Sequence, residues 1–204
     1  MLEDDFKQAI GSISTDKNLA DIYWNEIVAK HSHKSRYYHS LKHLESIWRQ
    51  LQPVKDQLQD WEAVLFAIAY HDFVYNVQQS NNEEKSAETA VEKLKAIGFD
   101  KDRTDRCYRH IIATKGHQVS DDTDTNYFTD ADLSILGSDE TTYKTYTENI
   151  RKEYRIYPSF MYKPGRKKVL QHFLALPGIF KTDHFHNLYE EQARINLNNE
   201  SATL

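Results

Sequence analysis

The chain has 204 residues, a length typical of one domain. Asp and Glu total 31 against 26 Lys and Arg, and this net charge of -5 gives no overall electrostatic footprint for nucleic acid or an anionic membrane. Hydrophobic residues make up 39% and aromatic residues 12%, which excludes a disordered chain, and six Gly with four Pro are too few for a turn-dense β architecture.

The N-terminal segment 1–7 is acidic and lacks the layout of a secretory signal. The longest apolar run, Ala63 to Tyr70, is far shorter than the roughly 20 residues that span a bilayer. The single cysteine, Cys107, cannot form an intramolecular disulfide and suits a reducing compartment. We therefore expect a cytoplasmic protein with no membrane partner and no nucleic-acid partner.

Apolar residues at helical spacing dominate the chain, and no segment shows sustained alternation with a period of two. Asp60, Asn81 and Asp100 stand at N-cap positions, and Pro53 and Pro158 act as stops. The pattern predicts helices, in chain order, over residues 19–29, 41–51, 61–68, 87–94, 100–112, 143–157, 166–174 and 188–197. The stretch 120–126 resembles an exposed loop. These observations predict an all-α fold with a single domain over residues 1–204.

Two of the ten histidines fall four residues apart. In a helix, His39 and His43 would share a face, and such a pair at a helix start can ligate one metal ion or divide into a ligand and a proton donor. The alternative is an exposed or hydrogen-bonded pair, which is the commoner outcome for so short a motif.

The dipeptide His71-Asp72 ends the apolar run 63–70 and is followed at once by Phe73-Val74-Tyr75. Two ionisable groups embedded in apolar sequence are costly to bury unless they pair, form hydrogen bonds or coordinate a metal ion. A structural His–Asp hydrogen bond and a metal site are both open interpretations of this dipeptide.

A third polar group comes from two aspartates beside a further apolar segment, where one can ligate and the other can cap a helix. In chain order, His43, His71-Asp72 and Asp132 supply two imidazoles and two carboxylates. This mixed set suits Mn, Fe, Mg, Co, Ni or Zn. We therefore predict a divalent metal site, with Asp130 as the alternative last ligand.

The ligand order His, then His-Asp, then Asp resembles the HD-domain superfamily of metal-dependent phosphohydrolases. The segments that carry the resemblance are 36–39, 71–75, 82–87, 130–137, 150–154 and 165–170, and they resemble a largely uncharacterised bacterial group of predicted HD phosphohydrolases. The resemblance implies an HD-type helical bundle that hydrolyses a phosphomonoester or phosphodiester bond of a small metabolite or nucleotide, with one or two metal ions per chain.

The segment Tyr38-His39-x-x-x-His43 is also similar to the signature of cyclic-nucleotide phosphodiesterases. That similarity implies that His39 donates a proton to the leaving group and that His43 binds metal. In the same comparison Asp72 can bridge two metal ions, Glu83 supports the water that the metal binds, and Asp132 is the last ligand.

Two further residues are candidates for contact with the substrate. Arg36 lies three residues before His39 and is the best-placed cation for a phosphate group. His117 is expected to face a cleft where a helix ends, as in HD enzymes that carry extra histidines there, whereas His110 is expected to lie on a helix surface. The basic group 163–168 is expected to be a helix start beyond Pro164.

Two other functions stay open at this point. One is oxygenation, because some HD-fold proteins with an extra pair of histidines hold two irons. The other is a non-catalytic sensor of a metal ion or nucleotide. His39 and Glu83 favour catalysis, because neither is needed merely to hold a metal ion. A homo-oligomer is possible through the aromatic stripe 143–157, although core packing explains such stripes more often.

Overall fold

A computed structural model describes all residues, 1–204, and is all-helical with no strand, which confirms the predicted fold class. The chain forms two compact units, residues 1–129 and 130–204. The prediction of a single domain stays a prediction. No helix combines the length and the apolar character that crossing a bilayer requires.

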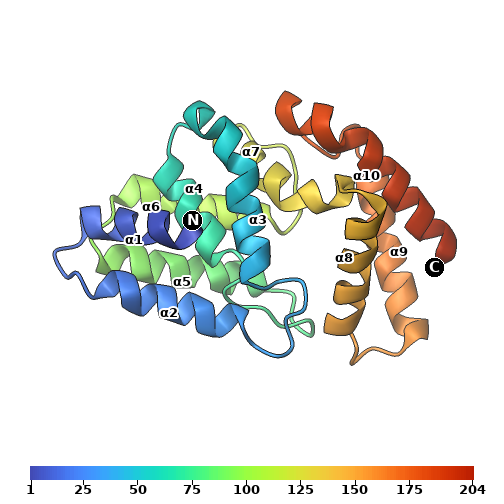
Figure 1. Ribbon diagram of the computed structural model, residues 1–204, viewed down its shortest axis with the longest axis horizontal. Helices are drawn as coiled ribbons and strands as arrows, with labels where there is room; N and C mark the ends of the chain where they lie inside the picture. Colours follow the sequence, from blue (N-terminus) through green and yellow to red (C-terminus); the bar gives the residue numbers. More distant parts are fainter. The chain divides into compact units, whose positions relative to one another are not determined.

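The first unit is built around helix α4 (Figure 1). Its helices are α1 (Leu2–Ile13), α2 (Leu19–His31), α3 (Leu41–Leu51), the short 3₁₀ helix η1 (Gln52–Gln57), α4 (Trp61–Tyr70), α5 (Asn82–Ala96) and α6 (Lys101–Ala113). Helix α7 (Thr123–Leu133) begins in this unit. The second unit continues with η2 (Ser134–Gly137), α8 (Glu140–Glu153), α9 (Ser159–Ala175) and α10 (Asp183–Thr203).

Helix α4 is buried on every side from Ala63 to Tyr70. It packs against α1, α3, α5 and α6, and a helix enclosed in this way must be apolar around its whole circumference. Phe66 contacts the rings of Phe6 and Phe99 edge-on, with centroids 5.7 and 5.1 Å apart. The end of this helix therefore delivers the residues that follow it, His71 and Asp72, to the centre of the unit.

Two buried acids, Asp60 and Asp124, fix the start of α4. Asp60 accepts a hydrogen bond from the Ala63 N–H at 3.1 Å, as its N-cap position predicts. Asp124 accepts from the backbone N–H groups of Gln59 and Asp60 at 2.9 and 2.8 Å. The expectation of an exposed loop over 120–126 is therefore wrong, because Asp124 is fully buried within α7 and receives these long-range hydrogen bonds.

The helices predicted from apolar spacing are all present, with some different ends. Helix α8 ends at Glu153 rather than at residue 157, and α9 begins at Ser159 and runs through Pro164. Pro164 is the sixth residue of this helix and has no N–H to donate to the Phe160 carbonyl, whereas the N–H groups of Met161 and Tyr162 bond the Pro158 carbonyl at the helix start. The expectation that this helix starts beyond Pro164 is wrong.

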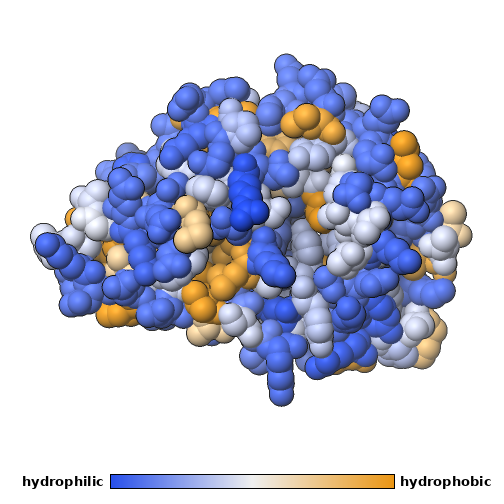
Figure 2. Space-filling view, viewed as in Figure 1, coloured by the Kyte–Doolittle hydropathy of each residue, from blue (hydrophilic) through white to orange (hydrophobic).

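The second unit is held by a largely buried ion pair between α9 and α10 and by a buried carboxylate that binds backbone N–H groups. Arg166 on α9 grips Glu200 on α10 with two hydrogen bonds of 2.7 and 2.9 Å, and Glu190 on α10 accepts from the N–H groups of Ile179 and Phe180. Arg166 is thus part of an internal pair rather than of a solvated basic face. Hydrophilic residues cover most of the face seen in Figure 2, with separate hydrophobic patches between them.

The contact of η2 with α10 requires a glycine at residue 137. A β-carbon at Gly137 would lie 2.5 Å from both the Cβ and the carbonyl oxygen of Tyr189, whereas one at Gly165, in α9, would meet nothing within 4 Å. We expect Gly137→Ala to lower the free energy of unfolding by at least about 1–3 kcal/mol. The matched change Gly165→Ala should raise it by about 0.5–1 kcal/mol. Urea denaturation measures both, and equal stabilities for the two variants would contradict this packing.

Candidate metal centre

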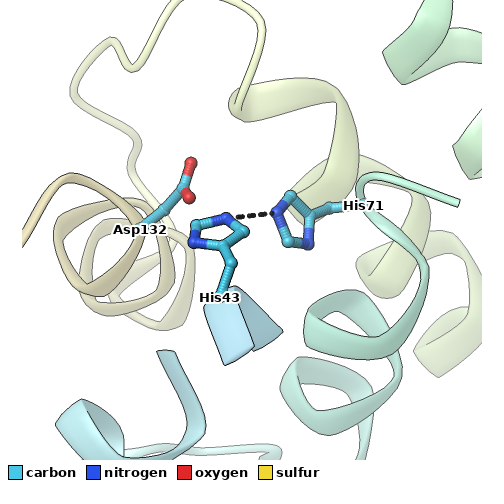
Figure 3. A group of neighbouring side chains, drawn as sticks. All are labelled: His43, His71 and Asp132. Atoms are coloured by element: carbon cyan, nitrogen blue, oxygen red, sulfur yellow. Dashed lines mark hydrogen bonds between the residues drawn. The ribbon is translucent and has the colours of Figure 1, made fainter. Parts of the chain in front are cut away.

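Two histidine rings meet at the centre of the first unit. His43 lies in the first turn of α3 and His71 directly follows α4, and both side chains are buried. Their Nε2 atoms face each other at 3.2 Å (Figure 3). Because α3 packs on α4, these two rings are brought together from positions 28 residues apart.

The backbone sets the tautomer of His71. Its Nδ1 lies 3.0 Å from the carbonyl oxygen of Ile68, in the last turn of α4. A carbonyl can only accept, so Nδ1 carries the hydrogen and Nε2 presents a lone pair. This is the arrangement in which a second hydrogen bond orients a histidine as a metal ligand.

Asp72 adds a carboxylate to the histidine pair. Its Oδ2 atom lies 3.1 Å from His71 Nε2 and 3.7 Å from His43 Nε2. Burial raises the pKa of this carboxyl, but the electrostatic and hydrogen-bonding effects of the neighbouring histidines, chiefly His71 and His39, outweigh burial and hold the pKa well below its ordinary range. Asp72 is therefore ionised at neutral pH, as a metal ligand must be.

Asp132 is the third member of the group. It lies one turn after Phe128 on the continuous helix α7, and the Phe128 ring contacts the His71 ring edge-on at 5.7 Å. Residues four apart share a helix face, so Asp132 is directed to the same place. The ligand atoms of His43, His71 and Asp132 all lie within 4.8 Å of one another (Figure 3).

These separations fit a divalent cation. Ligand atoms bound at about 2.1 Å to one ion, with angles near 90–110°, are about 3.0–3.4 Å apart. The 3.2 Å between the two Nε2 atoms and the 3.1 Å between His71 Nε2 and Asp72 Oδ2 match this range, and Asp132 lies within 4.8 Å of both histidine ligand atoms. His43, His71 and Asp132 thus form a group that could hold a metal ion, with Asp72 beside its two histidines.

The structure separates the two aspartates of α7. Asp130 is fully buried, accepts hydrogen bonds from the N–H groups of Lys181 and Thr182 and from the Thr182 hydroxyl, and pairs with the Lys181 ammonium at 3.2 Å. Thr182 is the N-cap residue of α10, so Asp130 fastens the start of that helix. This geometry favours Asp132 over Asp130 as the last ligand.

His39 lies beside the histidine pair but not on its helix. Helix α3 begins only at Leu41, so the expectation of a helical His39–His43 pair is wrong. The turn before α3 still places the His39 ring 5.7 Å from the His43 ring and 4.3 Å from the ring of Tyr75. Its charge also contributes to the low pKa of Asp72.

Arg36 joins the two segments that carry these residues. Its guanidinium donates to the carbonyl oxygens of His39 at 3.2 Å, Asp72 at 2.6 Å and Phe73 at 3.0 Å. These bonds give Arg36 a structural role at the centre, and its contact with substrate stays a prediction.

Glu83 and His117 lie outside the group of ligand atoms described above. Glu83 is in the first turn of α5, next to Glu84, which forms an ion pair with Lys115. His117 follows the end of α6 with a positive φ of 50°, and its N–H bonds the Ala113 carbonyl at 2.9 Å. The predicted end of this helix is confirmed, and the roles of both side chains stay predictions.

His110 is not on the surface. It is fully buried because α6 packs against both α4 and α5, and its Nδ1 shares a hydrogen bond of 2.7 Å with the Thr125 hydroxyl. Burial lowers its pKa to about 4. The expectation of a helix-surface histidine is therefore wrong.

A further buried histidine, which the sequence pattern does not indicate, is His31, the last residue of α2. Its side chain is buried, its Nδ1 donates to the Ile27 carbonyl at 2.9 Å, and its Nε2 has no hydrogen-bond partner. Burial and the charge of Arg36 lower its pKa to about 3, whereas Asp72 acts in the opposite direction. No local pattern marks this residue, because its charged neighbours lie on other segments.

No family model, curated protein or solved structure gives a significant match to this chain. The case for a metal centre therefore depends on the geometry of the side chains.

Substitution of Asp132 and of Asp130 should affect different properties, metal binding in the first case and stability in the second. Asp132→Asn should weaken Mn²⁺ or Zn²⁺ binding by at least about tenfold with little change in stability, because it removes a ligand. Asp130→Asn should lower the free energy of unfolding by about 1–3 kcal/mol and leave the ligand set intact, because it weakens a buried network. Titration calorimetry and urea denaturation separate the two effects. If Asp130→Asn alone abolished metal binding, the ligand assignment would be wrong.

Buried His31 predicts a loss of stability in acid. The residue is neutral in the folded chain down to about pH 3, whereas the unfolded chain takes up a proton near its ordinary pKa of 6.5. Between these values the unfolded state binds more protons, so stability falls as pH falls, by up to about 1.4 kcal/mol per pH unit from this residue. His31→Phe should flatten the pH dependence of urea denaturation between pH 6.5 and 4, and His33→Phe, at an exposed histidine, should not. Parallel curves for wild type and His31→Phe would exclude this source.

Proposed function

We propose that this chain is a metal-dependent phosphohydrolase of the HD type that cleaves a phosphomonoester or phosphodiester bond of a small metabolite or nucleotide. The observation that carries the proposal is the convergence of two histidine Nε2 atoms and the Asp72 carboxylate within 3.1 to 3.7 Å. The order of His43, His71-Asp72 and Asp132 along the chain, which resembles that superfamily, supports it.

The donor set defines what these residues do. His43 and His71 offer neutral nitrogen ligands, and Asp72 and Asp132 offer the negative charge that offsets a divalent cation. Such a mixed set suits Mn, Fe, Mg, Co, Ni or Zn, as one ion or two. When bound, a divalent cation lowers the pKa of coordinated water and polarises a phosphoryl oxygen.

His39 supplies the proton for the leaving group. In hydrolysis a water oxygen forms a bond to phosphorus, the bond from phosphorus to the leaving oxygen breaks, and that oxygen takes a proton from the His39 imidazole. The products are an alcohol and inorganic phosphate from a monoester, or an alcohol and a phosphomonoester from a diester, and the proton lost by water restores His39. Its place beside His43 rather than within the ligand group fits a proton donor.

The remaining candidates act around this centre. In this proposal Glu83 orients the attacking water, and Arg36 and His117 meet the substrate. Arg36 also donates hydrogen bonds to three carbonyl groups, so it holds the backbone of the site in place as well. We also propose a cytoplasmic location, in keeping with a cysteine, Cys107, that is buried and unpaired.

Metal analysis and a phosphoester panel test the proposal. The wild-type protein should release phosphate from 4-nitrophenyl phosphate or a sugar phosphate, or 4-nitrophenol from bis(4-nitrophenyl) phosphate, only with Mn, Mg, Co, Ni, Fe or Zn. Asp72→Ala should abolish this release. His39→Gln should retain the metal and lose about 10²- to 10⁴-fold in kcat on esters of poorly acidic alcohols.

Other outcomes would point to other functions. Bound iron with oxygen consumption and no hydrolysis would favour an oxygenase. Tight metal binding with no turnover, together with an increase in Tm on addition of a nucleotide, would favour a sensor. A protein that binds no divalent metal would exclude the ligand assignment altogether.

A further inference from the structure

An aromatic platform lies under the imidazole of His39. The ring of Tyr75 is 4.3 Å from the His39 ring, with the two planes tilted by 31°. The guanidinium carbon of Arg36 is 5.4 Å from the centre of the same Tyr75 ring. Tyr75 therefore contacts both His39, the proposed proton donor, and Arg36, which binds the carbonyl oxygens of the site.

The backbone on both sides of Tyr75 is fastened to α5. Val74 exchanges two hydrogen bonds with the buried Ser86 hydroxyl, at 3.0 and 3.3 Å. Asn76 exchanges two more with the Asn82 side chain, both at 3.0 Å. These bonds hold the backbone on both sides of Tyr75, so the position from which its ring extends is fixed although it lies in a loop.

His39 needs such a surface more than the metal-ligand histidines do. It precedes α3 and is not held by a helix, whereas His71 is oriented by the Ile68 carbonyl. An imidazole turns readily about the bond to its Cβ atom, and a stacked ring restricts that rotation. A misplacement of about 1 Å in a proton donor can cost about 100-fold in rate.

We propose that Tyr75, mounted by Arg36, Ser86 and Asn82, is a positioning residue that aligns the His39 imidazole with the leaving oxygen. This inference rests on the proposed function. It also names the substrate class, because a positioned acid matters only when the leaving group is a poorly acidic alcohol. The substrate is accordingly an alkyl or sugar phosphate ester rather than an aryl ester or an anhydride.

The test compares two esters and two variants. In 4-nitrophenyl phosphate the leaving group is 4-nitrophenolate, a stabilised anion, whereas the glycerol oxygen of glycerol phosphate leaves only when it is protonated. If the protein is a diesterase, the corresponding pair is bis(4-nitrophenyl) phosphate and a glycerophosphodiester. Tyr75→Leu should lose about 10- to 100-fold in kcat on the alkyl ester and less than about threefold on the aryl ester, with unchanged metal affinity. Tyr75→Phe, which keeps the ring, should retain wild-type selectivity.

Each contrary result has a defined meaning. An equal loss on the two esters, no loss on either, or a Tyr75→Phe variant as selective as Tyr75→Leu overturns the role of the ring while leaving the proposed function in place. Wild-type protein that hydrolyses neither ester with any of the metals overturns the proposed function and this inference together. Tyr75→Met fills the same space with a flexible side chain and replaces Tyr75→Leu if that variant does not fold.

Discussion

The rest of the site depends on one constraint, the position of buried His71 and partly buried Asp72 at the end of the apolar helix α4. A polar pair at the centre of a helical unit must find partners, since unpaired buried groups are costly. The Ile68 carbonyl accepts a hydrogen bond from Nδ1 of His71, and Nε2 of His71 lies 3.2 Å from Nε2 of His43. Arg36 then binds the carbonyl oxygens around the pair, so the chain before α3 and the chain after α4 are joined at this point.

Features that depend on local chemistry could be predicted from the sequence. Apolar spacing marks α4, and Asp60 and Asp100 cap helices through the N–H groups of Ala63 and Arg103. Features that depend on distant partners could not. Asp124 lies in a polar stretch yet is buried under two backbone N–H groups, and His110 and His31 are buried by packing that their own neighbours in sequence do not reveal. The spacing of His43, His71-Asp72 and Asp132 in the sequence predicted a polar group, of which His43, His71 and Asp132 lie together, whereas the contact of Tyr75 with His39 could not be predicted.

The two aspartates of α7 illustrate how geometry resolves what composition leaves open. Residues two apart on a helix point in nearly opposite directions, so Asp130 and Asp132 cannot serve the same site. Asp130 turns to the start of α10 and Asp132 to the histidine pair. Both carry the same functional group, and only their place on the helix decides which one holds a fold and which one offers a ligand.

The Ile68 carbonyl belongs to the core and to the site at once, since it lies in a fully buried helix and also orients a histidine. A substitution that shifts the packing of α4 would therefore also shift the Ile68 carbonyl, and with it the His71 ring whose Nε2 atom faces His43.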